Sequence, residues 1–181
     1  MTAHGSEPAD SSLLARIARG DEGAFAVLVH RYQNRFYTVA RRILGDDRES
    51  EDAVQRAFLQ VFLKAGHYQD RWRGSTWLYR VLTNICLDAW RKRARESEAL
   101  RALADAPEPR LAADGGDLDS ALARLPVEAR TILLLRYAGG LSGREIATVR
   151  GITVNTVKSQ LRRGKGLLRR YLGTGGRDGR R

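Results

Sequence analysis

The chain has 181 residues, of which 43% are apolar and 29% are charged, and its formal net charge is +11. That apolar content is enough for a packed core, and the length allows one domain or two small ones. Cys86 is the only cysteine and His4, His30 and His67 have no partner at metal-ligand spacing, which excludes an intrachain disulfide and a cysteine-based metal site and leads us to expect no cofactor.

The positive charge is concentrated in two blocks. Residues 1–95 carry 16 Lys and Arg against 11 Asp and Glu, residues 96–120 carry 2 against 7, and residues 121–181 carry 14 against 3. Two separate basic regions attract polyanions and suggest a nucleic-acid contact made in two places. The N-terminus has no signal-peptide pattern, and nowhere do 18 apolar residues follow one another. We therefore expect a cytoplasmic protein without membrane insertion.

The first half of the chain has the periodicity of helices. Residues 1–10 are expected to be disordered, and the chain is helical in pattern from Leu13. A long helix that ends at Gly45 is predicted by the apolar face formed by Phe25, Leu28, Tyr32, Phe36, Val39 and Ile43. A second helix is expected to open at Asp46 and to close at Gly66. Its apolar stripe consists of Val54, Ala57, Phe58, Val61 and Phe62.

A third helix is expected from about Thr76 to Arg95, with a cationic end that the helix dipole favours. The following stretch ADAPEPRLAADGGD has the composition of a linker. No strand pattern appears, so the predicted fold class is all-α with two small helical domains. The expected boundaries are residues 11–95 and 118–172 for the domains, 96–117 for a flexible acidic linker and 173–181 for a flexible basic tail.

The stretch SGREIATVRGITVNTVKSQLRRGKG, residues 142–166, predicts two short helices joined by a tight turn. Ser142 and Glu145 have the spacing of a capping box, which opens the first helix. Gly151 can adopt the positive φ that ends it, and Thr153 can cap the next helix. This is the layout of a helix-turn-helix.

The second of these helices has two faces. Val154, Val157 and Leu161 recur at spacings of three and four, so they share one buried side. The other side combines cations suited to phosphates with amide and hydroxyl groups suited to base edges, and this favours DNA recognition over a solvated helix pair. The residues that we assign to this contact are Thr153, Asn155, Thr156, Lys158, Ser159, Arg162 and Arg163.

Four motifs in order resemble the extracytoplasmic-function (ECF) sigma factors of bacterial RNA polymerase, members of the sigma-70 family that keep only regions 2 and 4. ESEDAVQRAFLQVFLKA resembles region 2.2, and TWLYRVLTNICLDAWRKR resembles regions 2.3 to 2.4. LARLPVEARTILLLRYAGGLS resembles region 4.1, and REIATVRGITVNTVKSQLRR resembles region 4.2. The resemblance covers nearly the whole chain after Leu13.

The resemblance implies a division of labour. Region 2 of such proteins docks on the β′ clamp helices of the core polymerase and melts the −10 promoter element, whereas region 4 binds the β flap and reads the −35 element as duplex. It also implies an anti-sigma factor as a partner, and we expect a monomer when the protein is free. The clamp contact falls on Asp52, Gln55 and Arg56.

The segment of residues 66–75 and the start of the next helix are expected to capture the melted −10 strand. Aromatic side chains stack on unpaired bases while cations hold their phosphates. Trp77 begins an apolar stripe, so we expect it in the core. The residues assigned to the −10 contact are Tyr68, Arg71, Trp72, Arg73, Arg80 and Asn84.

Two features depart from the common pattern. The family's loop carries a glycine two residues after its first aromatic and a second aromatic two residues before the region 2.3 helix motif. Here Tyr68 fits the first aromatic, but Asp70 stands at the glycine position and Gly74 at the second aromatic position, with Trp72 between them. This leaves the −10 base preference open. Gly164 and Gly166 each cost about 1 kcal/mol of helix stability relative to alanine, so we expect the recognition helix to fray there.

Two other classes stay open on the residues alone. A self-sufficient helix-turn-helix regulator would need a dimer interface and a palindromic site. A helical interaction protein with an incidental basic face would have no DNA sequence preference. Nothing in the sequence argues for an enzyme. We find no set of nucleophile and base residues, no phosphate-binding glycine loop and no paired carboxylates in an apolar context.

Overall fold

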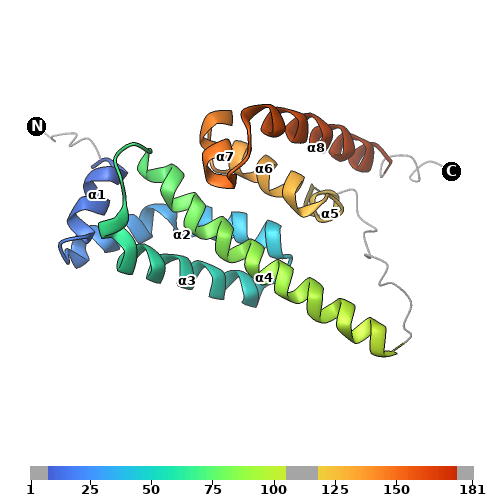
Figure 1. Ribbon diagram of the computed structural model, residues 1–181, viewed down its shortest axis with the longest axis horizontal. Coiled ribbons are helices and arrows are strands. Elements are labelled where there is room, and N and C mark those ends of the chain that lie inside the picture. Colours follow the sequence, from blue (N-terminus) through green and yellow to red (C-terminus); the bar gives the residue numbers. More distant parts are fainter. Residues whose placement is uncertain (1–7, 105–117, 175–181) are drawn as a thin grey trace, which may run out of the picture.

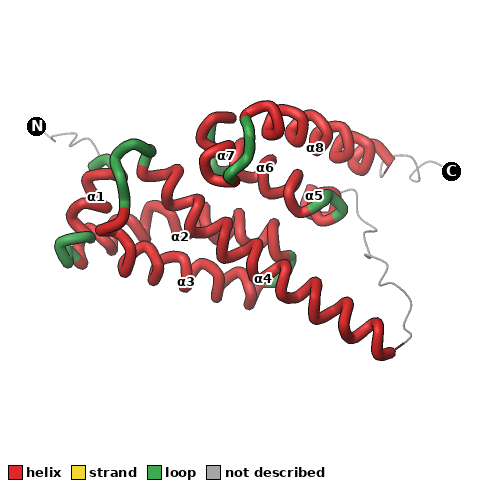
Figure 2. The backbone as a smooth tube through the Cα atoms, viewed as in Figure 1, coloured by secondary structure: helices red, strands yellow, loops and turns green. Residues whose placement is uncertain are grey.

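The computed structural model describes residues 8–104 and 118–174, and every regular element in these ranges is helical, as predicted (Figures 1 and 2). The N-terminal domain contains α1 (Asp10–Ile17), α2 (Glu22–Leu44), α3 (Asp47–Lys64), the 3-10 turn η1 (Ala65–His67) and α4 (Gly74–Ala104). The C-terminal domain contains α5 (Leu118–Ala123), α6 (Val127–Tyr137), α7 (Gly143–Arg150) and α8 (Val154–Thr174).

Caps that are visible in the sequence set the ends of the N-terminal helices. The Asp21 and Asp46 carboxylates accept backbone N–H bonds at the starts of α2 and α3, each at 2.8 Å. Gly45 ends α2 with φ of 78°, a conformation that glycine adopts without strain. The bundle is filled by aromatic rings, with Phe36 stacked on Phe58 at 5.3 Å between centroids. Tyr79 of α4 packs on the same Phe36 ring at 5.5 Å between centroids, which joins α4 to α2 and α3.

The helix-turn-helix has the predicted local structure. Ser142 and Glu145 form both bonds of the capping box, and Gly151 adopts the left-handed conformation with φ of 65°. The Thr153 hydroxyl accepts the N–H of Thr156 at 3.1 Å, which caps α8. The apolar stripe of α8 then packs on α6 and α7.

Several boundaries differ from the sequence predictions. α1 already begins at Asp10, inside the stretch expected to be disordered, and α4 continues from Arg95 to Ala104, inside the expected linker. Residues 1–7, 105–117 and 175–181, which make up most of the expected N-terminal, linker and tail segments, lie outside the described residues. Phe62, predicted to lie in the inner stripe of α3, is 37% exposed.

The predicted fray of α8 is wrong, because the helix continues unbroken through both glycines to Thr174. Gly164 is buried, and a Cβ at this position would lie 2.9 Å from Leu133 Cδ1 of α6. Gly164 therefore lets the two helices approach closely. A Cβ added at Gly166 would meet no atom of another part of the chain within 4 Å.

The two domains pack on each other (Figure 1), with α7 against α4 and α6 against α2. The N-terminal end of α7 meets that of α4, where Thr76 Oγ1 lies 3.2 Å from Glu145 Oε1. Periodicity alone did not predict this packing. It places the −10 candidates of the loop beside the helix-turn-helix.

Candidate nucleic-acid interface

The exposed face of α8 carries the side chains that we assigned to duplex DNA. Val157 is fully buried, whereas Asn155, Lys158 and Ser159 are exposed on the first two turns. Arg162 and Arg163 follow on the next turn and are also exposed. Figure 1 shows α8 on the outer side of the C-terminal domain, away from α4. The geometry suits a recognition helix whose first turns reach base edges and whose later cations reach phosphates.

Two of the seven candidates also hold the helix start. The Thr153 and Thr156 hydroxyls lie 2.9 Å apart, and the Ser159 hydroxyl donates to the Thr156 carbonyl at 2.9 Å. These bonds fix the side chains of the first turn. A local role in capping and a DNA contact are compatible for Thr153, because a hydroxyl has two acceptor lone pairs and a donor.

The loop before α4 and the first turns of α4 bring four of the −10 candidates together, with Tyr68, Arg71 and Arg80 around Trp72. The Tyr68 hydroxyl donates to the Trp72 carbonyl at 2.5 Å, which closes the loop on itself. The guanidinium carbons of Arg71 and Arg80 lie 4.9 and 5.0 Å from the Trp72 ring centroid. Arg73 is exposed at the end of the loop. The result is a half-buried indole flanked by cations, which is the combination that binds unpaired bases.

This loop forms one wall of a cavity of about 760 Å³. Arg31, Tyr32 and Arg35 of α2 form the opposite side, and residues 8–11 of the chain close one end. The cavity is concave and rich in donors that suit phosphate or base oxygens.

Asp10, which sequence reasoning did not single out, holds this wall. Its carboxylate accepts hydrogen bonds from Arg31 at 2.7 Å and from the Tyr32 hydroxyl at 2.5 Å. Burial and the Asp10 hydrogen bond raise the pKa of Tyr32 well above its usual range. A Cβ on Gly74 would lie 2.6 Å from Asp10 Cβ, so only glycine fits there. The missing second aromatic thus reflects the position of α1, which no local pattern reveals.

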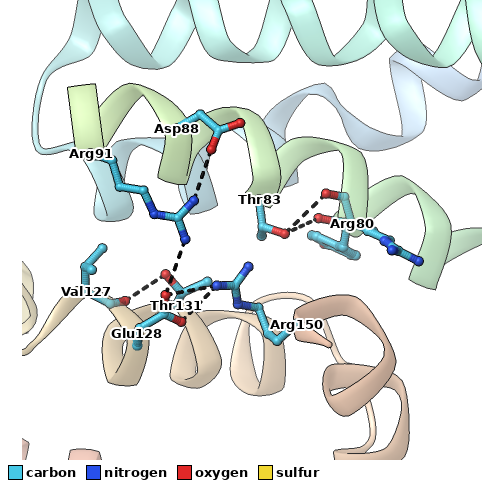
Figure 3. A network of polar contacts seen from close by, with 9 residues as sticks. Arg80, Thr83, Asp88, Arg91, Val127, Glu128, Thr131 and Arg150 are labelled. Carbon is cyan, nitrogen blue, oxygen red and sulfur yellow. Dashed lines mark hydrogen bonds and ion pairs between the residues drawn. The ribbon is translucent and has the colours of Figure 1, made fainter. Parts of the chain in front are cut away.

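The remaining candidates of α4 have different environments. Trp77 is 9% exposed and packs edge-on against Tyr68 at 5.9 Å, which confirms its predicted core position. Asn84 is exposed one turn after Arg80. Thr83 lies between them in sequence but is buried, and its hydroxyl donates to the Tyr79 carbonyl at 2.7 Å (Figure 3).

The clamp candidates share α3 with an exposed apolar surface. Asp52 and Arg56 lie one turn apart, with 3.6 Å between charged atoms, and Gln55 borders a groove of about 560 Å³ lined by aromatic and aliphatic side chains. Leu59 is 58% exposed and Leu63 is 67% exposed. Sequence reasoning missed these two leucines. An exposed apolar patch rimmed by polar groups is typical of a protein-protein contact.

The described residues contain no group of three or more His, Cys, Asp or Glu side chains that could hold a metal ion. Cys86 is buried, and burial raises the pKa of its thiol to about 12, so it stays protonated. Within the same described ranges, no helix is both long and apolar enough to cross a membrane.

Comparisons with known proteins match both domains of the chain. Residues 28–96 match the family described as sigma-70 region 2, and residues 116–168 match sigma-70, region 4. The chain is 31% identical to the ECF RNA polymerase sigma factor SigW of Bacillus subtilis, over 88% of this chain and 94% of that protein. It is 36% identical to the ECF RNA polymerase sigma factor SigE of Mycolicibacterium smegmatis, over 92% of this chain and 70% of that protein.

Solved structures share the fold of the two domains. The structure of CnrH in complex with the cytosolic domain of CnrY superposes with a TM-score of 0.72 at 26% identity, over 92% of this chain and 99% of that chain. The sigma factor RpoE of Bartonella quintana, solved with the anti-sigma factor NepR, shares the fold with a TM-score of 0.69 at 23% identity, over 82% of this chain and 96% of that chain.

Proposed function

The chain belongs to the ECF sigma factors of the sigma-70 family, the regulatory subunits that direct bacterial RNA polymerase to promoters, and we propose that its two domains read two promoter elements in different states of the DNA. The C-terminal domain reads the −35 element as duplex. The N-terminal domain holds the −10 element after it has opened. The observation that carries this proposal is the coexistence of an exposed recognition helix and a cation-flanked indole on separate domains.

For the −35 element, α8 enters the major groove with its first two turns. Asn155 is suited to bidentate hydrogen bonds with adenine, and Lys158 to guanine. Arg162 and Arg163 then grip phosphates, which adds affinity without sequence preference. The exposed positions of all four side chains support this assignment.

For the −10 element, the loop acts on the opened strand. An unpaired base stacks on Trp72, and Arg71 and Arg73 neutralise the adjoining phosphates. Arg80 and Asn84 on the first turns of α4 contact the upstream edge of the element. The cavity beneath the loop is large enough to receive a base.

The core polymerase contact on the N-terminal domain is the exposed surface of α3. Asp52, Gln55 and Arg56 supply its polar part, and Leu59 and Leu63 supply its apolar part. Depletion of charge at the centre with polar groups at the rim is the usual composition of a protein interface. The β′ clamp helices are the proposed occupant.

The C-terminal domain offers a second protein-binding groove. It has a volume of about 490 Å³ and lies between α5, α6 and α8, and Arg42 of α2 also lines it. Tyr137 and Leu172 are exposed at its edge, and Lys165 lies over the Tyr137 ring. The β flap of the polymerase and an anti-sigma factor are proposed to compete for this groove. An anti-sigma partner is supported by the structure of the sigma factor RpoE of Bartonella quintana, which is bound to the anti-sigma factor NepR.

Reconstituted transcription tests the proposal. Core RNA polymerase is combined with the purified protein on a fragmented library of its own genome. We expect transcripts from a small set of promoters that core enzyme alone does not use. If the core enzyme and the protein are both active and no fragment yields a promoter-specific transcript, the proposal is wrong. A footprint formed by the protein without polymerase would instead favour a self-sufficient regulator.

A further inference from the structure

A cavity of about 930 Å³ has walls from both domains, and arginines dominate its polar lining. Arg93 comes from α4, Arg130 from α6 and Arg163 from α8, and Arg124 directly follows α5. The volume falls in the range of about 300–1,000 Å³ that is usual for small-molecule sites. We call this space the arginine cavity. It shares no lining residue with the cavity beneath the loop before α4 or with the groove between α5, α6 and α8.

Arg130 is a buried cation of this cavity that is not paired with an acid. It is 6% exposed, its Nη1 donates to the Ala123 carbonyl at 3.4 Å, and its Nε has no hydrogen-bond partner among the described residues. None of the ion pairs between described residues includes Arg130. Burial, followed by the nearby charge of Arg93, lowers the pKa of Arg130. Taking a cation out of water costs free energy that a bound anion offsets.

The neighbouring charges leave the cavity positive. Arg93 donates hydrogen bonds to Glu49 at 2.8 Å and to the Leu44 carbonyl at 2.6 Å, which holds its guanidinium in place. Glu128 is the one acid among the described lining residues. It accepts two hydrogen bonds from Arg150, at 3.0 and 2.9 Å, and lies 3.8 Å from Arg91 (Figure 3). Because other arginines already balance Glu128, the cavity still attracts an anion.

The rest of the cavity wall is apolar and aromatic. Trp90 of α4 and Tyr171 of α8 are half-buried there, and the Arg124 guanidinium carbon lies 4.3 Å from the Tyr171 ring centroid. Aromatic rings and guanidinium planes stack on planar heterocycles, and guanidinium groups bind phosphate through paired hydrogen bonds. The lining therefore suits a ligand that combines a planar ring with phosphate groups.

We propose that the arginine cavity binds a free nucleotide, with its phosphates at Arg93 and Arg130 and its base against Trp90. The exposed side chains of Arg124 and Arg163 mark the side from which the ligand enters. A continuous duplex does not reach Arg130, because that side chain is buried inside the cavity. Nucleotide binding at this site is a property beyond the proposed reading of promoter elements.

The test compares two variants of the full chain that each lose one arginine of α6. Arg130→Met removes the buried cation of the cavity. Arg136→Met is the matched control, because Arg136 also donates to a backbone carbonyl, that of Leu141 at 3.0 Å, but does not line the cavity. Isothermal titration calorimetry in about 0.15 M salt, which screens the overall charge, measures binding of ADP, GDP, adenosine and inorganic pyrophosphate.

We expect ADP and GDP to bind wild type and the control saturably, at one site per chain. Arg130→Met should weaken ADP binding at least about tenfold relative to Arg136→Met, because a charge-assisted contact is lost. Trp90→Leu should weaken ADP binding at least about fivefold and leave pyrophosphate binding unchanged, because it removes only the stacking surface. Adenosine, which has no phosphate, should bind wild type at least about tenfold more weakly than ADP.

Thermal unfolding without ligand separates binding from a structural role of Arg130. Arg130→Met should unfold at the same temperature as Arg136→Met or higher, since it removes a buried charge that no acid offsets. A lower unfolding temperature would show that Arg130 stabilises the fold through Ala123, and would count against the site. If Arg130→Met does not fold, Arg124→Gln replaces it, and unchanged ADP affinity in that variant overturns the proposal.

Two further results would overturn the proposal. One is the absence of saturable ADP and GDP binding to wild type, and the other is equal ADP affinity of Arg130→Met and Arg136→Met, which would indicate attraction to the overall positive charge. Pyrophosphate that binds as tightly as ADP would overturn the assignment to a nucleotide. These titrations need neither promoter nor polymerase, so failure of the site and failure of the proposed function are distinguishable.

Discussion

Replacing Trp72 with alanine tests whether the loop before α4 promotes opening of the promoter. The Trp72 ring is half-buried, and Arg71 and Arg80 lie about 5 Å from its centroid. Stacking of an unpaired base on an aromatic ring contributes about 1–3 kcal/mol. The base must displace one of the two guanidinium groups, which costs about 0.5–1 kcal/mol at an exposed site.

The net contribution of Trp72 to the opened complex is then about 0.5–2 kcal/mol, or roughly 2- to 30-fold in the opening equilibrium. Permanganate reactivity of unpaired thymines on a promoter measures this equilibrium. We expect Trp72→Ala to lower it by that factor while leaving polymerase binding and −35 protection unchanged. A template with a premelted −10 bubble should restore most of the lost activity, because unpairing is then already complete.

The neighbouring Trp77 serves as the matched control. Trp77 is 9% exposed and belongs to the core, so Trp77→Ala should destabilise the domain by about 3–5 kcal/mol. Circular dichroism and thermal unfolding separate the two variants. If Trp72→Ala unfolds like Trp77→Ala, Trp72 is a core residue, and if bubble templates give no rescue in a folded Trp72→Ala protein, the loop does not act on melting.

The remaining predictions concern the C-terminal domain. Asn155→Ala should cost about 1–3 kcal/mol of binding free energy on the cognate −35 site and relax the base preference at one position. Arg163→Ala should weaken binding to all sequences alike and reduce the salt dependence of binding by about one phosphate contact. The reverse pattern in binding titrations would show that the face of α8 is assigned wrongly. Gly166→Ala should stabilise the protein by up to about 1 kcal/mol in urea unfolding, because a Cβ at this position meets no other side chain. Gly164→Ala should give no such gain or should destabilise the protein, because its Cβ would overlap with Leu133 of α6. Equal stabilisation by both substitutions would contradict the close approach of α6 and α8. Burial raises the pKa of Glu145, but its bonds to the capping serine and to α4 outweigh burial, so the pKa lies below the usual 4.5. The ionised Glu145 carboxylate therefore stabilises the folded protein above pH 4.5, and this stabilisation is lost as the pH falls through the lowered pKa. Glu145→Gln should flatten this part of the curve of unfolding free energy against pH relative to wild type. Parallel curves for the two proteins would contradict the lowered pKa.

Local signals predicted the elements of the helix-turn-helix almost completely. The capping box at Ser142, the left-handed Gly151 and the cap at Thr153 each depend only on residues a few positions away. Such interactions are encoded by spacing, so one sequence suffices to find them. The candidate face of α8 followed from the same periodicity.

Features that depend on distant residues were not predicted. Gly164 looked like a weak point of a helix because its partner, Leu133, lies on another helix. The extension of α4 past Arg95 is a different case, because it follows from local sequence: the next residues are good helix formers, and helix-breaking residues appear only later. Asp10 was assigned to a disordered end, since its contacts with Arg31 and Tyr32 span more than 20 positions.

The contact between Gly74 and Asp10 limits how this sigma factor can be re-engineered. Exchanging loops between relatives is an obvious way to graft a new promoter preference, and the family's usual loop brings an aromatic residue to position 74. In this scaffold its Cβ would lie 2.6 Å from the Cβ of Asp10, so the donor loop would push α1 off the bundle. The loop and the N-terminal helix are therefore one exchangeable module, and a functional chimera has to import both from the same donor.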